Sequence, residues 1–369
     1  MIQYDRQKPQ IANLQFFIML VAAVVPYGHF IYVHLSYIEA GRDAWLCMIF
    51  GFFIGSTVLY FLFHLTSMFP NQSLIGISKK VFGTQIGTIF SCLYIGFFSL
   101  VGALTMREVL SFMRLMYPHT PYQAFLIIEL FLVAWVVRAG LEVVARTTQL
   151  LLPVLIAFGV TAAIATLPDK DPRQLLPIID HGFTSLAGGT FIYVAMLSEL
   201  IVFGMIIHET QDPKLLRKKS LRVFGFLFIM FIGPVTGPIM IFGEQLAQAL
   251  TYPTYTEIQY INLYGIVERL DVLGVFLWMV GSFLRISIFL FCVTKGVCEL
   301  VNTNRDTNYT LPVILFTAGL TLSTMPLSRH EVHYFVLTVL PIIAIMAGYV
   351  LPLFTIVIAR LRKLEIKGF

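Results

Sequence analysis

Charged residues are scarce in this sequence, and their scarcity excludes several classes of protein. Asp, Glu, Lys and Arg make up 12% of the 369 residues, against about 25% in a typical soluble domain. So few charges could not solvate a globule of this length, which excludes a soluble enzyme, a disordered tail and a nucleic-acid-binding protein. Apolar residues take their place, since 58% of the chain is hydrophobic and the mean hydropathy is +0.83. The composition indicates an integral membrane protein surrounded by a lipid bilayer.

Cysteine is also rare, and the motifs of soluble enzymes are missing. The four cysteines lie in or beside apolar runs without paired spacing, which predicts neither a disulfide framework nor a zinc site; they are Cys47, Cys92, Cys292 and Cys298. The sequence has no phosphate-binding glycine loop, nucleophile elbow or zinc-protease helix. We therefore expect no cofactor, no bound metal and no enzymatic activity.

Long apolar runs recur along the chain. A helix needs about 20 apolar residues to cross the hydrocarbon core, and the alternating ten-residue segments of an outer-membrane barrel are missing. We predict one all-α polytopic membrane domain over residues 1–369 with ten transmembrane helices. The expected spans are 11–34, 44–65, 86–113, 122–138, 147–167, 190–208, 221–246, 272–297, 310–325 and 333–358.

The distribution of basic residues predicts the orientation. With ten spans, both termini lie on one side of the membrane, and 17 of the 25 Lys and Arg residues fall on that side. Six fall on the opposite side, and Arg107 and Arg285 lie within spans. Because cytoplasmic loops are enriched in basic residues, we expect both termini in the cytoplasm. The cluster Lys214–Arg222 belongs to this bias, or it is a patch for lipid or a partner.

Two spans contain helix-breaking residues. Pro26 lacks an N–H group, so the carbonyl of Ala22 loses its helical partner, and Gly28 loosens the next turn. Broken helices form binding sites in transporters, although a simple proline kink is an equal alternative. The seventh span carries Gly233-Pro234 and Gly237-Pro238, which predict a structural hinge.

Ionisable residues within spans are functional candidates, because they are costly in the bilayer. Glu199 and Arg285 fall near the middle of the sixth and eighth spans, and Arg107-Glu108 falls in the third. Each could line a site. Alternatively, Arg285 forms a structural ion pair with Glu199 or with Glu108. Glu129, near one end of the fourth span, is more typical of a structural residue.

Several landmarks in order make the chain resemble a known family. They are Pro26, Ala40-Gly41-Arg42-Asp43-Ala44-Trp45-Leu46, Met68-Phe69-Pro70 with Ser73-Leu74, Arg138-Ala139-Gly140-Leu141-Glu142-Val143-Val144-Ala145-Arg146, Leu175-Leu176-Pro177, Ser198-Glu199-Leu200, Tyr252-Pro253 with Thr256-Glu257-Ile258, and Val267-Glu268-Arg269-Leu270-Asp271. Together they resemble the endospore germination permease family, the GerAB-type B subunit of germinant receptors. That family is similar to amino acid–polyamine–organocation permeases.

The resemblance implies a fold and a site. The implied fold is the LeuT-type five-plus-five inverted repeat, with a first repeat over 11–167 (spans 1–5) and a second over 186–358 (spans 6–10). The midpoints of spans 1 and 6 then line the site, although span 1 lacks Gly-x-Gly and span 6 lacks Gly or Pro beside Glu199. The expected ligand-binding residues are Val25, Pro26, Tyr27, Gly28, Leu104, Glu108, Ser198, Glu199, Arg285 and Phe289.

The resemblance also implies a function. The chain would be the membrane subunit of a spore germinant receptor in the inner membrane of the spore. It would bind a small nutrient germinant, with an amino acid as the expected class, and trigger germination through the receptor's A and C subunits. The alternatives are a proton-coupled amino-acid transporter and a water or ion conduit.

Overall fold

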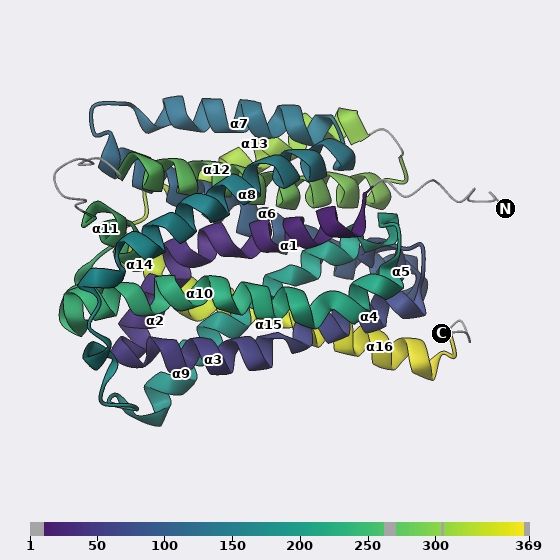
Figure 1. Cartoon of the computed structure of the whole chain (residues 1–369). Coiled ribbons are helices and arrows are strands. Elements are labelled where there is room, and N and C mark those ends of the chain that lie inside the picture. The colour runs from purple at the N-terminus through teal and green to yellow at the C-terminus, as the bar shows by residue number, and fades with distance from the viewer. Residues whose placement is uncertain (1–10, 262–270, 304–305, 365–369) are drawn as a thin grey trace.

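The structure is a bundle of helices. A computed structural model describes residues 11–261, 271–303 and 306–364 (Figure 1). Over these ranges the only strand-like pairing is a single bridge between Ile11 and Thr210. The all-α class is therefore confirmed for the described residues. Residues 267–270, which belong to the last sequence landmark, lie outside them.

The first half of the chain turns back on itself between its second and third helices. At that turn Gly41 has a φ of +55°, and a Cβ there would lie 2.0 Å from Oε1 of Glu244, so glycine is required. The elements of this half are α1 (Asn13–Tyr27), the π-helical turn η1 (Gly28–Tyr32), α2 (Val33–Ala40), α3 (Ala44–Gly55), α4 (Thr57–Met68), α5 (Leu74–Phe82), α6 (Thr84–Met116), α7 (Tyr122–Arg138) and α8 (Leu141–Ala165).

The second half contains a long helix that runs through two prolines. Helical geometry in α10 continues through Pro234 and Pro238 and first departs at Gly243 (φ 73°, ψ 168°). The backbone is therefore helical at 233–238, and a hinge at these residues stays a prediction. The hydroxyl of Tyr37 lies beside this part of the helix, 2.8 Å from the Val235 carbonyl and 3.2 Å from the Pro234 carbonyl, to which Pro238 cannot donate. The elements are α9 (Gly182–Ser198), η5 (Glu199–Met205), α10 (Pro213–Ala249), α11 (Pro253–Gln259), α12 (Asp271–Leu300), α13 (Asp306–Thr324), α14 (Arg329–Tyr334), η7 (Phe335–Val339), α15 (Leu340–Ile345), η8 (Met346–Val350) and α16 (Leu351–Leu361).

Among the described residues, seven helical segments are long and apolar enough to cross a membrane. The first would be about 84 Å long as one straight helix, but it turns at Gly41–Asp43 and so covers two of the expected spans. The helices α7 and α13 match two further expected spans and are not among the seven. The seven are Asn13–Met68, Thr84–Met116, Leu141–Ala165, Gly182–Met205, Pro213–Ala249, Val272–Leu300 and His330–Leu361.

Helix α1 lies in the interior of the bundle. It packs against α8 and α12 on one flank and against α10 on the other (Figure 1). Its residues from Met19 to Tyr27 are all buried, as expected for a helix that is apolar on every face. Large apolar side chains remain exposed on the outside of the bundle, including Phe53 and Trp135, which fits a chain surrounded by lipid.

Candidate ligand-binding site

Two helices in the interior leave α-helical geometry where they approach each other. Helix α1 contains Pro26 and passes into the π-helical turn Gly28–Tyr32. Helix α9 ends at Ser198 and continues as the 3₁₀ segment η5, which begins with Glu199. The turn η1 packs against α9. Because irregular helical turns often occur at functional sites, this level of the bundle is the candidate site.

A buried ion pair lies at this level. Arg285 of α12 and Glu199 of η5 have side chains that are 1% and 2% exposed, and Nη2 of Arg285 lies 2.5 Å from Oε2 of Glu199. Nε of Arg285 donates to Oγ1 of Thr105 on α6 at 3.0 Å, and Nη1 donates to the carbonyl of Ala23 on α1. Tyr32 of η1 donates its hydroxyl to Oε1 of Glu199 at 2.8 Å. The pair and its hydrogen bonds therefore connect five elements from four separate stretches of the chain: α1 with η1, α6, η5 and α12.

The surroundings of Arg285 compensate its burial. A buried charge is tolerated only when it is paired and hydrogen-bonded, and this guanidinium donates to three acceptors on three elements. Its Cζ also lies 4.6 Å from the ring centre of Tyr27 and 4.9 Å from that of Phe289, within the range of cation–π attraction. Gly281 allows α12 to approach α1, since a Cβ there would lie 2.4 Å from Cβ of Pro26.

Some of the residues predicted from sequence come together around this pair. Arg285 contacts three of the others: Tyr27, Glu199 and Phe289. Of the rest, Leu104 is buried next to Thr105, Gly28 packs against Phe231, and Ser198 donates to the Val194 carbonyl at 2.7 Å. Val25 and Pro26 instead line a cavity of about 170 Å³ between α1, α8, α10, α11 and α12.

Glu108 lies in a different set of contacts. Its Oε1 accepts a hydrogen bond from the hydroxyl of Tyr252 at 3.0 Å, and its Oε2 lies 3.6 Å from Nη1 of Arg107. The long side chain of Arg107 bridges the roughly 100° between neighbouring positions on a helix. Of the two alternatives for Arg285, the pair with Glu199 forms, and the pair with Glu108 is wrong.

Sequence reasoning missed three contributors to the site. They are the hydroxyl of Tyr32, the hydroxyl of Thr105 and the carbonyl of Ala23. Both side chains are polar groups within apolar spans, which is a weak signal in the sequence. The carbonyl lies one residue beyond Ala22, whose helical partner Pro26 removes.

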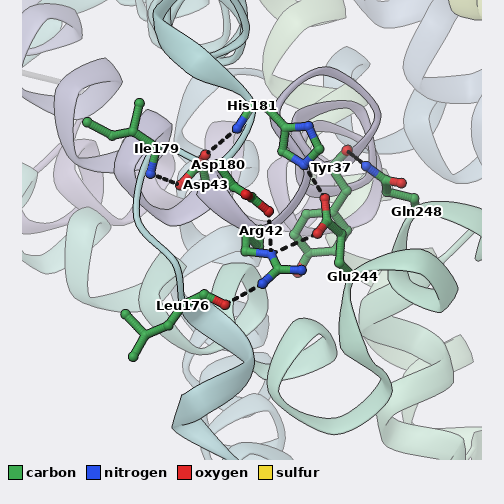
Figure 2. A network of polar contacts seen from close by, with 9 residues as sticks. All are labelled: Tyr37, Arg42, Asp43, Leu176, Ile179, Asp180, His181, Glu244 and Gln248. Carbon is green, nitrogen blue, oxygen red and sulfur yellow. Dashed lines mark hydrogen bonds and ion pairs between the residues drawn. The ribbon is translucent and has the colours of Figure 1, made fainter.

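A second network lies at one end of the bundle, where the turn after α2 meets the loop after α8 (Figure 2). Arg42 places its Nε 2.8 Å from Oε2 of Glu244 and 3.3 Å from Oδ2 of Asp180. His181 contacts the other oxygen of Glu244 through its Nε2. Asp43 accepts from the backbone N–H groups of Ile179 and His181. We call Arg42, Asp180, His181 and Glu244 the loop network.

The loop network has some of the chemistry of a metal site. Ligand atoms of Asp180, His181 and Glu244 lie within 4.8 Å of one another. The guanidinium of Arg42, however, already lies against both carboxylates and carries a permanent positive charge. A metal ion would have to displace this guanidinium. The arrangement therefore favours a structural role, in which ion pairs hold the turn after α2, the loop after α8 and helix α10 together.

A third set of hydrogen bonds joins the start of the first helix to residues 209–212. Ile11 donates its N–H to the carbonyl of Glu209 at 3.3 Å and accepts from Gln211 at 3.2 Å. Asn13 exchanges two hydrogen bonds with the backbone of Asp212, each 3.1 Å long. These bonds tie the start of the first helix to the segment that precedes α10.

Solved transporter structures share this fold. The chain aligns with the crystal structure of MhsT in complex with L-phenylalanine with a TM-score of 0.66 at 11% identity, covering 95% of this chain and 99% of that one. A Na⁺-coupled sialic acid symporter in a substrate-bound outward-open state aligns with a TM-score of 0.64 at 11% identity, covering 93% and 80%. At such identities the likeness shows a transporter-like helical fold and no more.

Sequence relatives are more informative about the family. Spore germination protein XB of Bacillus anthracis is 25% identical over 333 residues, covering 90% of this chain and 92% of the relative. Spore germination protein KB of Bacillus subtilis (strain 168) is 25% identical over 283 residues, covering 74% and 75%. A family model described as "Spore germination protein" matches residues 10–332. The resemblance seen in the sequence is thus confirmed, and the chain, an integral membrane protein, belongs to the spore germination permease family.

Proposed function

We propose that this protein is the membrane subunit of a spore germinant receptor and that it binds an amino acid at the Arg285–Glu199 pair. The observation that carries the proposal is the pair itself: one cation and one anion, both almost fully buried, on two elements beside the irregular turns of α1 and α9. The family match supports a role in germination.

The chemistry of the pair suits a zwitterion. The guanidinium fork of Arg285 can hold a ligand carboxylate through two parallel hydrogen bonds, and Glu199 can accept from a ligand ammonium. Insertion of an amino acid would replace one buried ion pair by two, so no charge is left unpaired. Without ligand, the direct pair keeps both buried charges satisfied.

Binding of this kind would also move helices. Arg285 and Glu199 lie on different elements, and a ligand between them lengthens their separation. A ligand shifts a conformational equilibrium only when it binds one state better than the other, and the state with the two side chains apart would be the state that binds. The receptor's A and C subunits are the proposed readers of this shift.

The finer architecture belongs to the same proposal. We assign ten crossings, by counting the two arms of Asn13–Met68 separately and adding α7 and α13. Residues 11–167 and 186–358 would then be inverted five-helix repeats, with both termini cytoplasmic in the inner membrane of the spore. The transporter-like fold supports this arrangement.

A proton-coupled amino-acid transporter is the second candidate. It is favoured by the solved structures that share the fold, one of which is bound to L-phenylalanine and one of which is named a symporter. The same site would serve both functions, so the distinction lies in whether the ligand crosses the membrane.

One experiment separates the candidates. A panel of radiolabelled amino acids and sugars is tested for equilibrium binding to the purified chain in nanodiscs, and the best ligand is then tested for uptake into sealed proteoliposomes. We expect saturable binding without sustained uptake. Accumulation driven by a proton gradient would establish the transporter, and ion flux without saturable binding would establish a conduit.

A further inference from the structure

The cavity beside α1 has a size and a lining that define a ligand class. Its volume is about 170 Å³, and an apolar cavity of about 150 Å³ in another protein stays dry and binds benzene. Most of the wall is aliphatic, from α8 (Leu152, Leu155, Ile156, Ala162) and α10 (Ile229, Met230). A molecule about as large as a six-membered ring therefore fits this space.

One polar atom of the lining lacks a partner. His29 lines the cavity, and its Nε2 is buried without a hydrogen-bond partner among the described residues. The ring also hydrogen-bonds the backbone of Met230. Pro234 cannot donate to the Met230 carbonyl, so the donor nitrogen of His29 replaces that lost N–H. In a neutral imidazole the other nitrogen is an acceptor, so Nε2 is a buried acceptor without a partner, and a ligand donor reaches it once the side chains packed around it move aside.

The charged side chain that lines the cavity already has an ion-pair partner. Among the described residues that line the cavity, Glu257 is the charged one. Its Oε1 lies 2.9 Å from Nζ of Lys170 and accepts from Oγ1 of Thr166 at 2.9 Å. Thr254 uses its hydroxyl on the His29 carbonyl at 3.0 Å. The site therefore suits a neutral ligand with one hydrogen-bond donor.

The cavity opens where the bundle would face lipid. Its rim includes Val160 of α8 and Ile229 of α10, which are 42% and 60% exposed, and an apolar exposed rim in a membrane protein lies against acyl chains. We propose that this cavity binds a small, neutral, ring-sized molecule that bears one hydroxyl group and enters from the bilayer, with the hydroxyl donating to Nε2 of His29. This site is separate from the proposed amino-acid site and does not depend on it.

Trp278 allows a direct test, because it lines the cavity and is one of three tryptophans in the chain. In a Trp45→Phe, Trp135→Phe background it is the remaining tryptophan. The probes are 4-bromophenol and 4-bromotoluene, which have nearly the same shape but differ in the hydroxyl, and bromine quenches tryptophan at contact. After correction for partition into protein-free nanodiscs, we expect saturable quenching by 4-bromophenol with at least tenfold tighter binding than 4-bromotoluene.

Three variants locate the effect. Gly159 lines the cavity and a Cβ there meets no atom within 4 Å, so Gly159→Leu should fill the space without a clash and abolish saturable quenching. Ala157→Leu, at an exposed position of the same helix, should bind as the background does. His29→Phe should reduce the preference for the phenol to less than twofold.

Several outcomes would overturn the site. Quenching that rises linearly with probe concentration and is equal for both probes would show partition into the bilayer only. Saturable quenching that persists in Gly159→Leu would place the binding elsewhere. If His29→Phe yields little folded protein, the comparison of Gly159→Leu with Ala157→Leu decides whether the probe binds in this cavity. Neither of these substitutions removes the hydrogen bond between His29 and Met230.

Discussion

The central pair and the loop network use the same chemistry in different surroundings. In each, one arginine joins segments far apart in sequence through carboxylates. Arg285 and Glu199 are 1% and 2% exposed, whereas Arg42, Asp180 and Glu244 are 25%, 37% and 11% exposed. Breaking a buried pair leaves an uncompensated charge and costs about 3–5 kcal/mol, while ion pairs nearer to solvent contribute less, down to about 0–1 kcal/mol for exposed ones. Burial, and not residue type, therefore decides how much each ion pair contributes to stability.

The largest expected effect is that of Arg285→Ala. This change leaves Glu199 buried without its cation, so we expect a loss of about 3–5 kcal/mol, seen as a strongly reduced yield of folded protein and no ligand binding. Arg285→Lys should retain part of both, because the charge remains while the planar fork is lost. Size-exclusion yield and thermal unfolding in nanodiscs measure this, and a stable Arg285→Ala protein that binds ligand normally would remove the pair from the mechanism.

A smaller effect is expected from Glu199→Gln. The amide keeps the size of the side chain, and its one oxygen can accept from Arg285 while its NH2 group donates to the hydroxyl oxygen of Tyr32. Arg285 loses its anion but keeps Thr105 and the Ala23 carbonyl as acceptors, so the protein level should fall less than in Arg285→Ala. Without the carboxylate, the partner for a ligand ammonium is lost, and we expect at least a tenfold loss of amino-acid affinity. Glu129→Gln on α7, also a buried carboxyl, is the matched control and should bind normally. A normal response of Glu199→Gln to every germinant would make Glu199 purely structural.

Sodium should have little effect on ligand affinity. The guanidinium of Arg285 is charged at any physiological pH and already contacts Thr105, Glu199 and a carbonyl of α1, so a nearby sodium ion would be repelled. We expect less than a twofold change in affinity when sodium is replaced by a bulky organic cation. A large loss would contradict this arrangement and support an ion-coupled transporter.

The loop network should tolerate substitution. Glu244→Gln keeps hydrogen bonding to Arg42 but removes the ion pair, and we expect a loss of about 1 kcal/mol or less. Salt screens the interaction between exposed charges. The difference in stability between Glu244→Gln and wild type should therefore shrink when salt is raised from about 0.05 to about 0.5 M, which shortens the screening length roughly threefold. Thermal unfolding checks this, with Arg42→Gln and the double variant completing the cycle. A loss as large as that of Arg285→Ala would mean that burial does not distinguish the two clusters.

Thiol labelling of introduced cysteines should place the loop network on the non-cytoplasmic side of the membrane. No change in stability is expected from these substitutions. The basic asymmetry puts the loops 36–43, 114–121, 168–189, 247–271 and 326–332 on that side. We expect an impermeant thiol reagent added outside sealed, right-side-out membranes to label Asp171→Cys and to leave Arg217→Cys unlabelled, with the parent chain as the background control. The reverse pattern would reject the orientation.

Local composition was enough to predict long membrane-crossing helices, seven of which the described residues contain, because an apolar run of about 20 residues is constrained by the thickness of the bilayer, whatever it packs against. The landmarks were enough to predict the family, which the comparisons confirm. Pro26 correctly indicated an irregular turn in α1, since proline removes a donor in any context. At Pro234 and Pro238 the backbone stays helical, and side chains far away in sequence lie against the carbonyls there: the ring of His29 bonds the backbone of Met230, and the hydroxyl of Tyr37 contacts the carbonyls of Val235 and Pro234.

The sequence by itself determined that the chain is an all-α membrane protein, that it belongs to its family, and that Glu199 and Arg285 needed partners at depth. Only the tertiary structure decided which partners they have: Arg285 pairs with Glu199 and not Glu108, with Tyr32, Thr105 and Ala23 completing the cluster. It also decided that α9 tightens into a 3₁₀ segment with no Gly or Pro beside Glu199, and that a cavity forms next to His29. The physical reason is that hydropathy acts residue by residue, whereas the partner of a buried charge depends on how helices pack across the bundle.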